Sequence, residues 1–238
     1  MIKASLHRGS QVLMYTYAFV LQSSGSIVLP AGISGELMLL YELGVGAVVE
    51  PGLDLAVLEQ SDERLMRAVL HHDQVIREVF EQAPVLPLRF GTQFVSQEKL
   101  LEHLHLNAAA YQTTLTRLVG QAEYTLKLSP RSPESSAASP LATAGTGRDY
   151  FLAKKRQFQQ QLDRQQQQQT ELQALKAAIA QEYPALQVDE PRDGIERLHL
   201  LVKRADEALL HESLEKWRSR CPNWQMALSE ALPPYHFV

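Results

Sequence analysis

Short apolar runs in the first half of the chain predict β-strands. The run at residues 12–21 (VLMYTYAFVL) is rich in β-branched and aromatic residues and predicts a buried strand. Residues 36–44 and 46–52 are two further apolar runs bordered by glycine, and they predict two more strands. The run at residues 123–128 (EYTLKL) predicts a strand that closes this part of the fold.

The apolar period changes to that of a helix at residues 61–83. Either Ser61 or Asp62 is placed to cap the first turn, and Pro84 ends the segment. The expected apolar stripe of this helix comprises Leu65, Val69, Ile76 and Phe80.

A second amphipathic helix is predicted at residues 96–120. Ser96 is expected to cap its start, and Gly120 stands where the glycine that follows a helix belongs. The apolar positions on one face are Leu101, Leu104, Ala108, Tyr111, Leu115 and Leu118.

Between these helices, residues 84–94 (PVLPLRFGTQF) alternate with a period of two, which predicts a strand. One face of that strand is apolar, and the other carries Arg89. Pro87 cannot donate a hydrogen bond to a neighbouring strand, so the strand is expected at a sheet edge or with a break there. Gly91 permits the turn that follows. The apolar face comprises Leu86, Leu88 and Phe90.

The order of these elements predicts an α+β fold with two domains. Residues 1–128 are expected to form a ferredoxin-like sandwich with its helices on one side of the sheet. Residues 129–147 are rich in proline, serine and alanine and read as a linker. Residues 148–238 are expected to form a smaller α+β domain that ends in a tail at residues 233–238.

A long helix is predicted at residues 148–183, where neither proline nor glycine occurs. Its stripe is interrupted by the glutamine run at 165–169, which is expected to be the solvated middle of the helix. After it, residues 196–204 predict a strand, 206–220 a helix and 223–231 a strand. The stripe comprises Phe151, Phe158, Leu162, Leu172, Leu175, Ile179 and Tyr183.

Composition narrows the class of protein. The chain of 238 residues has a formal net charge of -4, which disfavours nucleic-acid binding. One cysteine, Cys221, excludes an intramolecular disulfide, suits a reducing compartment, and is expected to be a buried thiol. No apolar run is long enough to span a membrane, and the first residues lack the pattern of a signal peptide. We therefore expect a cytoplasmic protein.

Histidines are the first candidates for chemistry. His71 and His72 are adjacent on a helix and so point about 100° apart, and His103 and His105 also diverge. A metal site needs ligands on one face, so no metal site is expected. His72 and Asp73 are instead expected to flank the apolar stripe and to form local hydrogen bonds.

Arg89 is the second candidate. The chain contains no phosphate-binding loop and no nucleophile motif that would serve a catalytic arginine, and no cofactor is expected. A buried guanidinium needs a partner, because its isolated charge is costly to desolvate. We therefore expect Arg89 to be a structural charge, anchored to backbone carbonyls or paired with Glu50, Asp54 or Asp73.

Six motifs follow one another along the chain, namely YTYAFV, HHDQVIREVF, VLPLRFGTQF, GQAEYTLKL, GRDYFLAKKRQ and LPPYHFV. In this order they resemble the GvpF/GvpL family of gas vesicle proteins. Leu232 stands where the family has tryptophan, and the glutamine run and the first thirteen residues have no counterpart in it. The residues that carry the family motifs are His71, His72, Leu86, Pro87, Arg89, Phe90, Gly91, Thr92, Tyr150, Lys155, Arg156, Pro233, Pro234, Tyr235 and Phe237.

The resemblance implies a role without catalysis, as a minor component or assembly factor of gas vesicles. The implied partners are the main shell protein and other accessory proteins of the vesicle, and the implied location is cytoplasmic. Edge-strand addition near Pro87 is our hypothesis for shell-protein binding. Two alternatives stay open: a small-molecule- or metal-binding sensor or enzyme, and an interaction scaffold in which the long helix forms a coiled coil. The C-terminal tail is expected to fold back, with a peptide ligand for another protein as the alternative.

Overall fold

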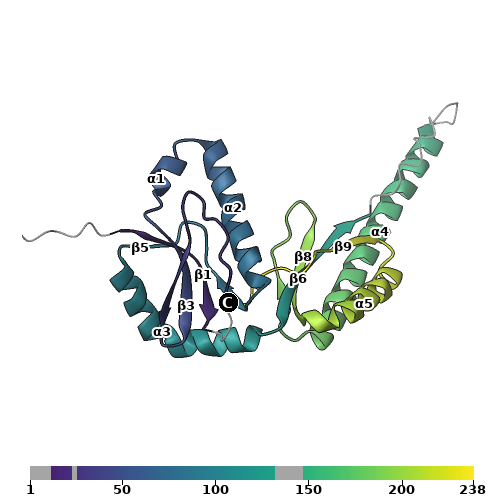
Figure 1. The fold of residues 1–238 in the computed structure, drawn as a ribbon. Coiled ribbons are helices and arrows are strands. Elements are labelled where there is room, and N and C mark those ends of the chain that lie inside the picture. Colours follow the sequence, from purple (N-terminus) through teal and green to yellow (C-terminus); the bar gives the residue numbers. More distant parts are fainter. Residues whose placement is uncertain (1–11, 23–25, 132–146) are drawn as a thin grey trace, which may run out of the picture. The chain divides into compact units, whose positions relative to one another are not determined.

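The computed structural model describes residues 12–22, 26–131 and 147–238. The chain divides into two compact units. The first comprises Met1–Ala122 together with Leu232–Val238, and the second comprises Glu123–Ala231. Figure 1 shows the α+β character of both units.

The first unit contains a five-stranded antiparallel sheet. Four strands have the order β2-β3-β1-β4, with β1 at Met14–Leu21, β2 at Met38–Glu42, β3 at Val45–Pro51 and β4 at Val85–Pro87. The short β5 (Gln93–Phe94) also pairs with β1. With β1 central between β3 and β4, this is the strand order of a ferredoxin-like sheet.

Helices pack on both faces of this sheet, which corrects the expectation of a single helical layer. The pairing of β1 with β3 shifts register between Thr16 and Ala18, which is the mark of a β-bulge. Tyr15 and Tyr17 both contact His72 of α2 (Asp62–Phe80), whereas Phe19 contacts α3 (Gln97–Leu118). The bulge thus allows Tyr15 and Tyr17 to contact α2 while Phe19 of the same strand contacts α3. A short helix, α1 (Leu55–Leu58), precedes α2.

The helix boundaries agree with the sequence signals, but the stripes agree only in part. The Ser96 hydroxyl accepts a hydrogen bond from the backbone N–H of Lys99, and Gly120 has the positive φ of a residue that ends a helix. In α2, Val69 is exposed, and the core position is taken by Ala68. His72 occupies a buried position that the apolar pattern did not mark.

The strand β6 (Gln121–Pro130) corrects the expected domain boundary. It was expected to close the first sheet, but it pairs with β9 (Trp224–Leu228) in a second, four-stranded sheet of order β7-β8-β6-β9. The remaining strands of that sheet are β7 (Gln187–Val188) and β8 (Glu196–Lys203). Alternation predicts a strand, but it does not say which sheet the strand joins.

Two helices complete the second unit. The long helix α4 spans Gly147–Glu182, and α5 spans Glu207–Arg220 after the 3-10 turn at Arg204–Asp206. Leu172, Leu175 and Ile179 of α4 are buried, as predicted, and so is Trp217 of α5. Most of the predicted linker lies outside the described residues. No described helix combines the length and apolar character that crossing a lipid bilayer requires.

Candidate functional site

The motif segment after α2 forms a strand and a tight turn. Leu88 donates its backbone N–H to the Tyr17 carbonyl (2.9 Å), directly after β4 ends at Pro87. Arg89 to Thr92 then form a turn, closed by the Thr92 N–H bond to the Arg89 carbonyl (3.1 Å). Gly91 has φ 89°, a value that favours glycine, at the third position of this turn. The chain then returns to pair with β1 through β5.

Arg89 is exposed, which corrects the expectation that it is buried and paired. Within the described part of the chain its guanidinium makes no ion pair, and the three carboxylates considered as partners have other roles. The physical reason is that β4 stops two residues earlier, so the alternation of the sequence does not continue as a strand. Phe90 lies inward instead, with its ring centroid 5.6 Å from that of His72.

His72 is the centre of a buried hydrogen-bond network beneath this turn. Its Nε2–H donates to the Leu88 carbonyl (3.0 Å), because a carbonyl can only accept. Its Nδ1 therefore accepts from the Tyr15 hydroxyl (2.8 Å). The ring of Tyr17 stacks on the imidazole with centroids 5.1 Å apart. Both ring nitrogens are thus committed inside the protein, and the expected local hydrogen bonding of His72 is confirmed.

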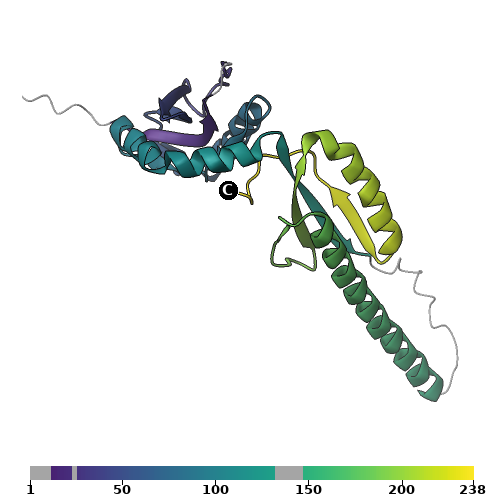
Figure 2. The same ribbon diagram turned by 90° about the horizontal axis from the view of Figure 1, so that it is seen from below.

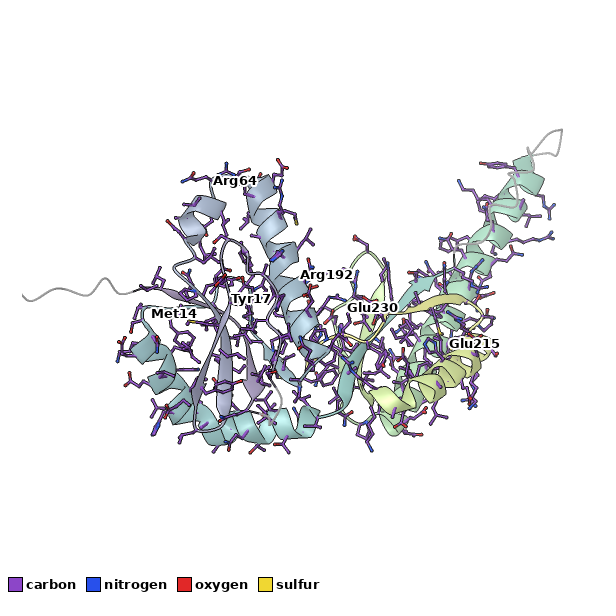
Figure 3. The ribbon with its side chains drawn as sticks, in the orientation of Figure 1. Met14, Tyr17, Arg64, Arg192, Glu215 and Glu230 are labelled. Carbon is purple, nitrogen blue, oxygen red and sulfur yellow. The ribbon has the colours of Figure 1, made fainter. Side chains whose placement is uncertain are left out.

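Glu50 is the second polar centre of this unit. Its side chain accepts hydrogen bonds from the Tyr17 hydroxyl (2.5 Å), the Ile33 backbone N–H (2.7 Å), and both the N–H and hydroxyl of Ser34 (2.8 and 2.9 Å). Figure 3 marks Tyr17 in the interior of the first unit. A Cβ added to Gly32 would lie 2.4 Å from Glu50 Oε2, so glycine is required there. The carboxylate therefore fastens the loop before β2 to the sheet.

The environment sets the protonation states of both groups. Burial lowers the pKa of His72 from its ordinary value, because the charged imidazolium is poorly solvated there. Burial alone would raise the pKa of Glu50, but the hydrogen bonds from Tyr17, Ser34 and Ile33 outweigh it and lower that pKa. Near neutral pH the network therefore contains a neutral imidazole and an ionised carboxylate.

The C-terminal tail joins the first unit and folds back onto two of its helices. The Tyr235 hydroxyl donates to Asp73 of α2, and Arg117 of α3 donates to the Phe237 carbonyl (2.7 Å). Pro233, Pro234 and Phe237 are buried. The expectation that the tail folds back is confirmed for its contacts with this unit.

The remaining motif residues lie apart from this network. His71 points away from His72 and its Nε2 is bonded to the Ala31 carbonyl (3.1 Å). Tyr150, Lys155 and Arg156 lie on α4 of the second unit, where they are exposed. Cys221 is a buried thiol, as expected, and burial raises its pKa.

Sequence reasoning missed the partners of His72. Tyr15 and Tyr17 were assigned to a buried strand without a polar role, and Glu50 was considered only as a partner of Arg89. The signal was present, because an acidic residue inside the apolar run of β3 needs donors when both faces of the strand are buried. The bulge that brings Tyr17 to Glu50 had no sequence signal.

The arrangement is a scaffold in which polar groups hold turns and loops in place.

Two crystal structures share the fold of this chain: the gas vesicle protein GvpF from Anabaena sp. PCC7120 and that from Microcystis aeruginosa. The first is 14% identical, with a TM-score of 0.69 over 96% of this chain and 98% of that chain. The second is 16% identical, with a TM-score of 0.66 over 95% of this chain and 98% of that chain. No curated protein sequence matches this chain.

The fold is thus the one seen in these two structures, an α+β protein of two units. The family model of the gas vesicle synthesis protein GvpL/GvpF matches residues 13–238. The chain belongs to this family, and the resemblance of its motifs is confirmed.

Proposed function

We propose that the protein binds the main gas vesicle shell protein and assists the nucleation or assembly of the vesicle in the cytoplasm. The observation that carries this proposal is the family match, which covers nearly the whole chain. A binding role without catalysis is supported by the network around His72, in which the ring nitrogens and the Glu50 carboxylate are occupied by hydrogen bonds within the protein.

The edge formed by β4 is poorly suited to strand addition. Because Leu88 N–H bonds to β1, alternation directs the N–H of Leu86 to β1 and leaves positions 85 and 87 facing outward. Position 87 is a proline and offers no N–H. Only one donor of this three-residue strand therefore faces outward, which argues against the hypothesis that shell-protein binding occurs near Pro87.

The opposite edge, β2, is a better binding surface. Leu43 and Gly44 form a two-residue turn with φ values of 45° and 79°, so Glu42 and Val45 form the hydrogen-bonded pair that closes the hairpin. Alternation then leaves the backbone N–H and C=O groups of Leu39 and Tyr41 free to face outward. Exposed apolar side chains accompany this edge, namely Met38, Tyr41 and Leu43. We propose that a strand of the shell protein adds to β2.

A matched pair of variants tests this binding surface. Leu39→Pro removes one outward N–H without removing a bond between β2 and β3, whereas Leu39→Thr keeps that donor. We expect Leu39→Pro to weaken co-purification with the shell protein about tenfold, because the added strand loses its hydrogen bond to residue 39 and its adjacent hydrogen bonds are weakened. Leu39→Thr should bind like the wild type. Equal binding by all three proteins would exclude the β2 edge, and no binding by the wild type would exclude the proposed function.

A further inference from the structure

The first half of α4 is exposed. Every residue from Arg148 to Asp163 whose side chain is described is exposed. Among the described residues, hydrogen bonds from the side chains of α4 to the rest of the unit begin at Arg164, which donates to the Arg131 carbonyl (2.8 Å), and continue at Gln168. Figure 2 shows this half of the helix extending beyond the strands of its unit. At about 1.5 Å per residue, the exposed part is about 25 Å long.

An apolar stripe runs along this exposed half. Phe151, Phe158 and Leu162 are 68%, 61% and 42% exposed. With Lys155 they follow steps of four, three and four residues, which is the spacing of a coiled-coil seam. The buried residues later in α4 lie about 90° away around the helix axis, at about 100° per residue. The stripe is therefore a separate face and not an extension of the core.

Basic residues surround the stripe. Residues 148–158 contain four basic residues and one acidic residue, a net charge of +3 in a chain whose net charge is -4. Lys155 lies within the stripe, and Arg148 and Lys154 lie about 60° to either side of it. A lysine within such a seam needs an acidic partner when the seam is buried, because its isolated charge is costly to desolvate.

We propose that this face of α4 binds an acidic amphipathic helix of a partner protein. The partner's apolar side chains would pack on Phe151, Phe158 and Leu162, and one of its carboxylates would pair with Lys155. The lysine fixes the register of the pair, as single polar residues do in coiled-coil seams. This contact is separate from the β2 edge and goes beyond the proposed binding of the shell protein.

Two other occupants fit the surface less well. A parallel second copy of α4 would place Lys155 against its own counterpart, and an antiparallel copy would place Lys155 beside Phe158, so neither orientation gives the lysine in the seam an acidic partner. A lipid surface requires a broad apolar face, whereas here the stripe is narrow and the neighbouring positions include Gln157, Gln159 and Gln161. Charge and stripe width therefore favour an acidic helix.

The test uses a designed acidic helical peptide as the probe. The peptide is about three heptads long, with leucines in the seam, glutamates flanking it and one glutamate placed opposite Lys155. Its binding to the full chain is measured by fluorescence anisotropy. The control probe replaces the glutamates with lysines, and vesicles of phosphatidylserine form a second control. We expect binding of the acidic peptide alone.

Two sets of variants locate the contact. Leu162→Ser removes an apolar group from the stripe, whereas Leu152→Ser makes the same change at an exposed leucine about 100° away from Phe151. We expect Leu162→Ser to weaken binding about tenfold and Leu152→Ser to have no effect. Lys155→Glu should abolish binding of the acidic peptide. The same variant should bind a peptide in which the glutamate opposite position 155 is replaced by lysine.

The outcomes separate this proposal from the proposed function. Loss of binding in Leu162→Ser and rescue by the charge exchange would support it. Equal binding of acidic and basic peptides, equal effects of the two serine variants, binding to vesicles alone, or no binding by the wild type would overturn it. Leu39→Pro, which changes only the β2 edge, should bind the acidic peptide normally.

Discussion

Glu50 lies in β3 and Arg89 lies in the turn after β4, and the structure gives these two charged residues opposite environments. Glu50 is 1% exposed and accepts bonds from three residues, whereas Arg89 is exposed. From the sequence, Arg89 was expected to be the buried charge because it lies in the motif, and Glu50 was considered only as one of its partners. What decides the outcome is where each strand ends, and β4 ends before Arg89.

A pair of substitutions tests this contrast. Glu50→Gln keeps the size of the side chain but replaces an accepting oxygen with an NH2 group, so buried donors lose their partner. We expect it to destabilise the first unit by about 2–4 kcal/mol. Arg89→Ala should change stability by no more than about 0.5 kcal/mol, as is usual at the surface. Urea unfolding, monitored by hydrogen exchange of the β1 amides, measures the loss of stability in both variants. A larger loss for Arg89→Ala than for Glu50→Gln would contradict the role of the Glu50 network.

His72 gives the first unit a pH dependence. Its pKa in the folded protein is below the ordinary value of 6.5. As pH falls below about 6.5, the unfolded chain therefore binds a proton before the folded chain does. The stabilising contribution is present above pH 6.5 and is lost as pH falls to the folded pKa. We expect an NMR titration of the His72 ring, assigned with His72→Gln, to give a midpoint below 6.5; a midpoint above 6.5 would show that the imidazole is not held neutral.

At the level of elements, local signals predicted the helices well and the ends of strands poorly. Ser96, Gly120 and the absence of helix breakers after residue 148 marked boundaries that the structure confirms. The apolar residues of α4 were predicted to share one stripe, interrupted by the glutamine run at 165–169. Only its second half is buried, because the helix extends beyond the sheet that covers it. Helical spacing predicts which residues share a face, but it does not say what covers that face.

The two serine caps provide a matched prediction. Ser96 bonds to a backbone N–H of α3, whereas Ser61 precedes α2 without a side-chain capping bond. We expect Ser96→Ala to cost about 1 kcal/mol of stability, and Ser61→Ala to cost less than about 0.5 kcal/mol. Thermal unfolding of the two variants measures the difference. Equal shifts in Tm would mean that the hydroxyl of Ser96 does not cap α3 in solution.

At the level of the whole molecule, the first unit is built from both ends of the chain. The chain leaves it after α3, forms the second unit, and returns to it at Leu232. The sequence predicted the folding back of the tail. It did not predict that the strand after α3 enters the second sheet, because pairing partners distant in sequence are not encoded by local alternation.

Removal of the tail tests this arrangement. Deletion of residues 232–238 removes one hydrogen-bond partner each from Asp73 and Arg117, and it removes three buried side chains. We expect faster hydrogen exchange in β1 and α2, since the first unit loses part of its packing. Both tryptophans, Trp217 and Trp224, lie in the second unit, so tryptophan fluorescence should not change. Unchanged exchange in the first unit would show that the tail does not stabilise it.

Binding of the shell protein during vesicle assembly is the role that we propose for this member of the gas vesicle family. The most direct measurement is the yield of gas vesicles in cells that carry the shell-protein genes, read as turbidity lost on pressure collapse. We expect the yield to fall when the gene for this chain is deleted, and to recover with the wild type or Leu39→Thr but not with Leu39→Pro. An unchanged yield after deletion would contradict the account.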